Sequence, residues 1–63
     1  MAKYRCYFLD AQSHIVAAEV IDSPDDASAQ QIAAQMLQAR QHHAIELWDG
    51  PRRVARLQRE PAR

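Results

Sequence analysis

The chain has 63 residues, with eight basic and eight acidic side chains, so its formal net charge is zero. At this length we expect one domain with a thin core, because only about 60% of the unfolded chain's surface is buried on folding. The single glycine, Gly50, excludes phosphate-cradling loops and dinucleotide-binding fingerprints, which need several glycines for close backbone approach. We expect the domain to span residues 1–59 and residues 60–63 to be a frayed tail.

The composition also predicts that the fold gains stability by association. Hydrophobic residues make up 48% of the chain, but 12 of them are alanines, so few large apolar side chains remain for the core. A marginal core is normally supplemented by disulfides, a metal or oligomerisation. Cys6 is the only cysteine, which rules out an internal disulfide and is typical of a reducing, cytoplasmic setting. The amino terminus leads into no apolar run and no stretch approaches a membrane span, so no membrane partner is expected.

The first two segments of the chain predict a β-hairpin. Residues 4–9 form a compact apolar and aromatic run, and residues 15–21 are rich in β-branched side chains. Asp10 suits the first position of the connecting turn, where its carboxylate accepts a hydrogen bond from the backbone two residues on.

The sequence Ser-Pro-Asp-Asp at residues 23–26 predicts the start of a helix. Ser23 is expected at the N-cap and Pro24 at the first helical position, with the two aspartates at the positive end of the helix dipole. The helix is expected to end near residues 40–43, where a histidine takes the left-handed conformation that glycine usually takes. Five residues share an arc of about 140°, the width of a core-facing stripe: Ala29, Ile32, Ala33, Met36 and Leu37.

The last part of the chain predicts a second hairpin. Residues 44–48 alternate as a strand, and Asp49-Gly50 is a strong signal for a hairpin turn. Residues 52–58 continue as a fourth strand around Val54, Ala55 and Leu57. The arginines at 53, 56 and 59 also fit helical spacing, so a short carboxy-terminal helix is the alternative.

Together these elements predict an α+β fold in ββαββ order, with one helix on one face of a mostly antiparallel four-stranded sheet. The expected strand order is 2-1-3-4, because a right-handed crossing through the helix can place the third strand beside the first. A helix about 10 Å wide covers only one face of a sheet whose strands lie about 4.8 Å apart. The other face is therefore solvated or used for binding.

Side-chain alternation along the strands assigns many apolar residues to this uncovered face. In the second strand the purely apolar set of Val16, Ala18 and Val20 is expected to face the helix. An apolar patch is typical of an interaction site, so we predict an interaction domain that forms a homodimer by packing two uncovered faces together. The predicted interface residues are Tyr7, Leu9, Ile15, Ile21 and Trp48.

Nucleic-acid binding is the alternative function. Tyr7 and Trp48 would stack on bases, and four arginines would contact phosphates: Arg5, Arg52, Arg53 and Arg56. Residues 1–39 carry two basic and five acidic side chains, whereas residues 40–63 carry six basic and three acidic ones, so the molecule is a charge dipole. Against this alternative, the net charge is zero and no RNP motif is present. Arginines on a last strand also protect a sheet edge from unwanted pairing.

The sequence predicts no enzyme activity, no metal site and no cofactor. Cys6, His14, His42 and His43 are the only soft or borderline metal ligands, and their spacing matches no zinc pattern. The serines have structural roles in a turn, a cap and a first helical turn, and the paired aspartates at 25 and 26 are explained by the helix amino terminus. The uncharged glutamine and alanine residues on the back of the helix offer a second surface to an unidentified protein partner.

Three segments of the chain resemble a family of short, functionally uncharacterised bacterial proteins: Tyr4-x-x-Tyr7-Phe8-x-Asp10, the capped helix, and Ile45-Glu46-Leu47-Trp48-Asp49-Gly50. The resemblance covers most of the chain and departs from the family pattern at residues 11–13, where a turn containing glycine is more usual. It implies a small ββαββ domain and supplies no activity or site.

Overall fold

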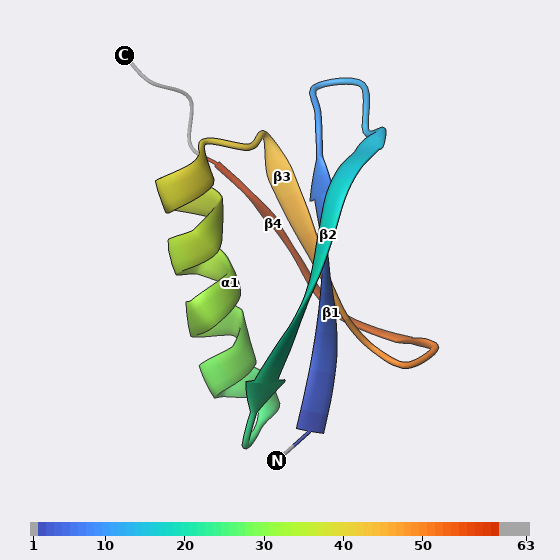
Figure 1. Ribbon diagram of the computed structural model, residues 1–63, viewed down its shortest axis with the longest axis vertical. Coiled ribbons are helices and arrows are strands. Elements are labelled where there is room, and N and C mark those ends of the chain that lie inside the picture. Colours follow the sequence, from blue (N-terminus) through green and yellow to red (C-terminus); the bar gives the residue numbers. More distant parts are fainter. Residues whose placement is uncertain (1, 60–63) are drawn as a thin grey trace.

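The computed structural model describes residues 2–59 and contains a four-stranded sheet and one helix, α1, in the order ββαββ (Figure 1). The strand order is β2-β1-β3-β4 with all neighbours antiparallel, and α1 packs on one face. This confirms the predicted α+β class and strand order, and the last segment is a strand rather than a helix. The predicted frayed tail at 60–63 lies outside the described residues. The elements are β1 (Ala2–Leu9), β2 (Ile15–Ser23), α1 (Asp26–Arg40), β3 (Ala44–Asp49) and β4 (Arg52–Gln58).

The turn between β1 and β2 is held by Asp10, as its position predicts. The Asp10 carboxylate accepts hydrogen bonds from the backbone N–H groups of Gln12 and His14, each at 2.9 Å. Ser13 takes a left-handed conformation, with φ of 66°, in the place where glycine would be less strained. Beyond the turn the register shifts by one residue, which makes Val16 the extra residue of a β-bulge.

The helix begins two residues later than predicted. Its N-cap is Asp25, whose carboxylate accepts from the backbone N–H of Ser28 at 2.8 Å. Ser23 is instead the last residue of β2, where it is fully buried opposite Ala2 and its hydroxyl donates to the Asp25 carbonyl at 3.2 Å. Ser23 cannot cap because its backbone is still paired in the sheet, so Pro24 precedes the helix instead of opening it.

The predicted core-facing stripe of α1 is confirmed by the burial of Ala29, Ala33 and Leu37. At the end of the helix, Gln41 takes the left-handed conformation with φ of 56°, not a histidine. The Arg40 side chain in the last turn lies 5.4 Å above the Phe8 ring.

The core lies between α1 and the inner face of the sheet, which is the face that α1 covers. Its members come from β1, α1 and β3 and are at most 3% exposed. Ile21 of β2 and Leu57 of β4 pack against it. The core residues are Tyr4, Cys6, Phe8, Ala29, Ala33, Leu37, Ile45 and Leu47.

The two faces of β2 are the reverse of the prediction. Ala17, Glu19 and Ile21 lie opposite inward-facing residues of β1, whereas Val16 and Val20 are more than half exposed. Glu19 is tolerated on the inner face because β2 is an edge strand and Arg40 from the end of α1 pairs with the Glu19 carboxylate. A paired charge at the rim of a core does not carry the full penalty of an isolated one.

Gly50 and Pro51 form the two-residue loop between β3 and β4, since Asp49 pairs directly with Arg52. Gly50 has φ of +60° and Pro51 cannot adopt positive φ, which is the pattern of a type II′ turn. A second bulge, at Val54, shifts the register of β4 against β3.

Candidate interaction surface

The face of the sheet opposite α1, which we call the outer face, carries two rows of side chains that run across the strands. In one row Trp48 lies between Arg5 and Arg53, and in the next Glu46 lies between Tyr7 and Arg56. Cross-strand neighbours of this kind have Cβ atoms about 5 Å apart and interact directly. The outer face therefore alternates aromatic and charged groups over β1, β3 and β4.

The centre of the outer face is occupied by ion pairs and hydrogen bonds around Glu46. Trp48 Nε1 donates to Glu46 Oε1 at 3.1 Å, and the guanidinium groups of Arg53 and Arg56 lie 3.7 and 3.9 Å from Glu46 Oε2. Glu46 is less exposed than the two arginines, with 18% of its side chain accessible against 54% for Arg53 and 37% for Arg56. The polar groups in this part of the face are therefore largely paired with one another, and Trp48 is half-buried among them.

Apolar exposure is concentrated on β2. Ile15, Val16 and Val20 are 60%, 53% and 58% exposed, and they are the large hydrophobic side chains that the described part of the chain leaves open to solvent. Ala18 between them is also exposed. These four residues are named the β2 edge, because β2 is the outermost strand on its side of the sheet.

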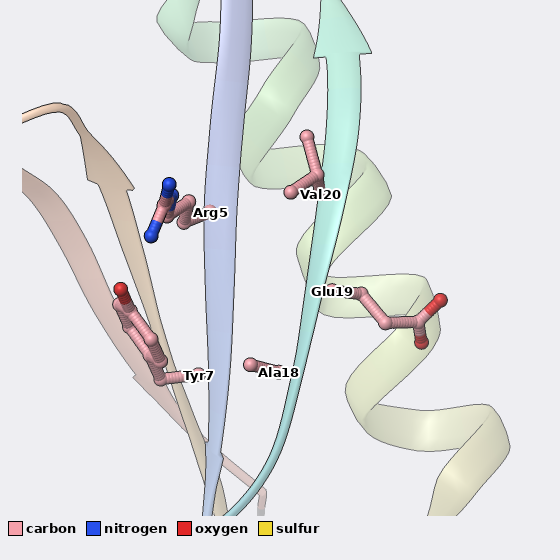
Figure 2. Close-up of a pocket in the computed structure, with 5 residues that line it drawn as sticks. All are labelled: Arg5, Tyr7, Ala18, Glu19 and Val20. Carbon is pink, nitrogen blue, oxygen red and sulfur yellow. The ribbon is translucent and has the colours of Figure 1, made fainter.

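A shallow hollow of about 210 Å³ adjoins the β2 edge between β1 and β2 (Figure 2). Arg5 and Tyr7 of β1 and Ala18 and Val20 of β2 line it. Glu19 also borders the hollow, but its side chain points toward α1, away from the other four. Ala18, which lies opposite Tyr7, contributes only a methyl group to this lining.

The other edge of the sheet has different chemistry. β4 presents exposed arginines at 52, 53 and 56, whereas the exposed residues of β2 are apolar except for Asp22. Charged side chains on an edge strand discourage pairing with another chain. Both edges contain a bulge, so it is the arginines that distinguish the protected edge from the open one.

The predicted interface residues are placed in three different environments. Ile15 belongs to the exposed β2 edge, and Tyr7 and Trp48 lie half-buried on the outer face. Leu9 is 3% exposed, and Ile21 packs against the core on the inner face, so the predicted placement of Ile21 on the outer face is wrong.

The prediction that the apolar set of β2 faces the helix is wrong. Its members, Val16, Ala18 and Val20, are exposed. The opposite face of β2 carries one charged residue, Glu19, which forms an ion pair with Arg40. Alternation alone does not reveal that partner, because it comes from the far end of the helix.

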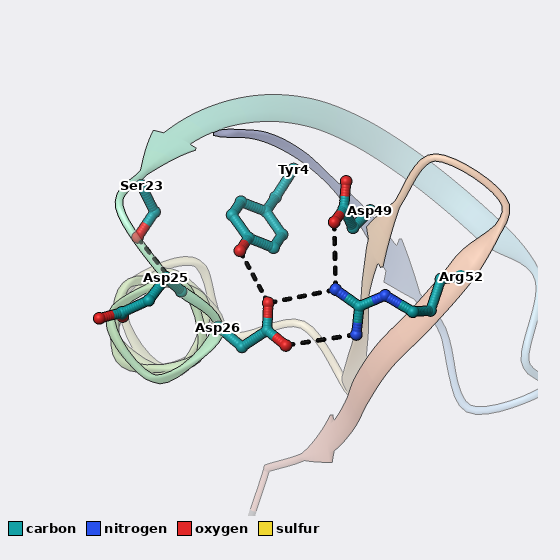
Figure 3. Close-up of polar contacts among 6 residues, drawn as sticks. All are labelled: Tyr4, Ser23, Asp25, Asp26, Asp49 and Arg52. Atoms are coloured by element: carbon teal, nitrogen blue, oxygen red, sulfur yellow. Dashed lines mark hydrogen bonds and ion pairs between the residues drawn. The ribbon is translucent and has the colours of Figure 1, made fainter. Parts of the chain in front are cut away.

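A polar network joins the start of α1 to the β3–β4 hairpin on the inner side (Figure 3). The Tyr4 hydroxyl donates to Asp26 Oδ1 at 2.7 Å, and Arg52 donates to both Asp26 oxygens at 3.2 and 3.3 Å and to Asp49 at 3.1 Å. The hydrogen bonds from Arg52 and Tyr4 lower the pKa of Asp26, and the bond to Asp26 is the main cause that raises the pKa of Tyr4 to about 12. The Arg52 guanidinium is therefore paired with the carboxylates of Asp26 and Asp49.

Two observations on residues 2–59 concern the Cys6 thiol and the candidate metal ligands. Cys6 is fully buried, and burial raises the pKa of its thiol more than nearby Arg40 lowers it, so the nucleophilic thiolate is disfavoured. No three or more His, Cys, Asp or Glu side chains in this part of the chain converge on a shared metal position. Nor does the described chain contain a helix with the length and apolar character to cross a membrane.

The chain matches no family model, and neither the curated proteins nor the solved structures include a significantly similar one. The β2 edge, the adjoining hollow and the arginine-flanked Trp48 are the features from which a function can be argued.

Proposed function

We propose that this protein is a small interaction domain that forms a homodimer through the β2 edge. The observation that carries the proposal is the exposure of three β-branched side chains, Ile15, Val16 and Val20, on one strand at the rim of the sheet. A cluster of exposed apolar side chains on a folded chain is typical of an interaction site. The surface differs from the predicted one, which placed the contact on Tyr7, Leu9, Ile21 and Trp48 as well as Ile15.

The small size of the core supports a second copy as the partner. The core contains eight buried residues, three of which are alanine or cysteine on α1 and β1. Each buried Val or Ile side chain contributes roughly 1.5–3 kcal/mol of hydrophobic stabilisation. Burial of Val16 and Val20 against another copy therefore adds stabilisation that is large relative to the roughly 3–9 kcal/mol expected for a chain of this length.

Size-exclusion chromatography with light scattering tests the proposal. At tens of micromolar we expect a mass of about twice the chain mass of 7.2 kDa. Val20→Glu should give a monomer, because dimerisation would bury a carboxylate without a partner. Gln35→Glu adds the same charge on the exposed back of α1 and should leave the dimer intact. A monomeric wild-type chain, or a Val20→Glu variant that dimerises like wild type, contradicts the proposal.

Nucleic-acid binding is the second candidate, and the position of Trp48 between Arg5 and Arg53 favours it. An aromatic ring flanked by guanidinium groups is the arrangement used for base stacking with phosphate contacts. Among residues 2–59, however, Arg52 is paired with Asp26 and Asp49, and Arg53 lies against Glu46. These pairs reduce the positive charge available to phosphates, so self-association is the better supported function.

Titration of a mixed-sequence oligonucleotide at two salt concentrations separates the two candidates. Binding that weakens steeply as salt is raised supports the nucleic-acid function, because phosphate contacts release counterions. Absence of binding at low salt excludes it.

We also propose the cytoplasm of a bacterium as the setting. A free, fully buried Cys6 suits a reducing compartment, and the resemblance of residues 4–10 and 45–50 to the short bacterial family supports the source.

A further inference from the structure

The sequence of β2 reads almost the same in both directions around Ala18. Residues 15–21 are Ile-Val-Ala-Ala-Glu-Val-Ile, so Val16 and Val20 lie at equal distances on either side of Ala18. When two copies of one strand pair antiparallel about a twofold axis, residues at equal distances from the axis lie opposite each other. The strand is therefore complementary to a second copy of itself.

We propose that two copies of this chain pair β2 with β2 antiparallel, with Ala18 on the twofold axis. The two four-stranded sheets then form one continuous sheet, and both α1 helices lie on the same face, because the twofold axis runs perpendicular to the sheet. This inference rests on the proposed homodimer and specifies how its two copies meet. The contact is between edges, unlike the packing of two outer faces.

The Ala18 register brings the exposed apolar side chains of the two copies together. Val16 of each copy lies opposite Val20 of the other, and Ala18 lies opposite Ala18, where its small side chain allows close approach. Glu19 lies opposite Ala17 of the second copy, which leaves room for the ion pair between Glu19 and Arg40. The bulge at Val16 interrupts the strand at that residue, so the paired segment around Ala18 is short and ends at the two valines.

Registers whose twofold axis is shifted by one or two residues bring less compatible side chains together than the Ala18 register does. A twofold axis at Glu19 places two carboxylates against each other and Val16 against Asp22. An axis at Val20 places Ala18 against Asp22, and an axis at Ala17 leaves Val20 beyond the end of the second copy's strand.

The β2 edge is accessible for this pairing. Val16, Ala18, Val20 and Asp22 are all exposed, and β2 has a paired strand, β1, on one side only. An edge strand with unpaired backbone groups and mostly apolar exposed side chains is open to addition of another strand. The arginines of β4 disfavour the same pairing at the opposite edge.

Disulfide cross-linking of single-cysteine additions tests the register. The variants are Ala18→Cys and the matched control Asp22→Cys, both at exposed positions of β2, with the buried Cys6 retained in each. Opposed residues of antiparallel strands have Cα atoms about 4.5–5.5 Å apart, within the range that a disulfide spans. Two copies of residue 22 would be separated by about 26 Å along the strand in the proposed register.

Under mild oxidation of the dimer, we expect Ala18→Cys to give a covalent dimer at least about tenfold faster than Asp22→Cys, given these separations. Wild-type chain should give none, because Cys6 is buried. Circular dichroism of each variant confirms that the fold is retained. A non-covalent dimer in which Ala18→Cys does not cross-link, or in which Asp22→Cys cross-links equally fast, overturns the register and leaves the homodimer standing. A monomer by light scattering overturns both.

Discussion

The Tyr4 hydroxyl donates a hydrogen bond to Asp26 at 2.7 Å, which joins the first strand to the first turn of the helix (Figure 3). Arg52 binds the same carboxylate, so three elements that are distant in sequence meet at one side chain. The contact also contributes to the pH dependence of the stability of the fold.

We expect the acid limb of the stability curve to depend on Asp26. Hydrogen bonds from Arg52 and Tyr4 lower the pKa of this carboxyl in the folded state below the value of about 3.9 in an unfolded chain. Its contribution to stability is therefore fully present above about pH 4–5 and is lost as the pH falls through the folded pKa. Asp26→Asn should lower the urea midpoint at neutral pH and flatten its decline in acid.

The control for this prediction is Asp22→Asn, an exposed carboxylate on β2 that forms no ion pair with the other residues of the described chain. It should keep the acid dependence of wild type. The pKa of Asp10 is also lowered, first by the backbone N–H of His14, so part of the acid dependence should persist in Asp26→Asn. An unchanged slope in Asp26→Asn would mean that the network does not contribute.

At alkaline pH, Tyr4 should ionise far later than an ordinary tyrosine. Its hydrogen bond to Asp26 is the largest cause that raises its pKa to about 12, followed by burial. Because the folded pKa is raised, the contribution to stability is complete below about pH 10 and is lost as the pH rises toward 12. Ultraviolet difference titration of the folded chain should show a phenol that ionises near pH 12, and Tyr4→Phe should remove that step. A step near pH 12 that survives in Tyr4→Phe would contradict the assignment to Tyr4.

The same substitution should have very different effects at two isoleucines. Ile45 is fully buried between α1 and the sheet, whereas Ile15 is 60% exposed. Ile45→Val should lower the free energy of unfolding by about 0.5–1.5 kcal/mol, since it removes a buried methylene. Ile15→Val should change it by less than about 0.5 kcal/mol. Urea denaturation followed by circular dichroism at a concentration where the chain is monomeric measures both. Equal effects at the two positions would contradict the placement of the core.

Trp48 fluorescence distinguishes contact between edges from contact between outer faces. Trp48 lies on β3, two strands from β2, or about 10 Å at the usual strand spacing. Its emission should therefore stay constant on dilution through the range where light scattering shows the mass falling to that of one chain. A red shift on dilution would indicate that Trp48 is covered in the dimer, as packing of two outer faces requires. The chain contains one tryptophan, so the signal has a single source.

Local sequence signals were sufficient for most of the fold. The Asp10 turn, the stripe of Ala29, Ala33 and Leu37, and the hairpin at Gly50 all depend on neighbouring residues, and all are confirmed. The N-cap was predicted two residues too early, because Ser23 has the right side chain for a cap but remains paired with Ala2. Strand pairing with a distant residue overrode the local preference.

The candidate site depended on contacts that the sequence does not encode locally. Alternation defined two sets of residues on β2, and the apolar set was assigned to the core. In the structure the other set faces inward, and Arg40, 21 residues away in the chain, pairs with Glu19 at the rim of the inner face. In this orientation Ile21 and Ala17 pack against the core, and Val16, Ala18 and Val20 are exposed.

The amino-acid sequence by itself determined the element order, one uncovered face of the sheet and a core small enough to favour a partner, since these follow from length, periodicity and turn chemistry. Only the tertiary structure decided which side of β2 faces the helix and which sheet edge is open. Those features depend on register, on the bulge at Val16 and on charges brought together across the fold, and each is set by packing between segments that are far apart in the chain.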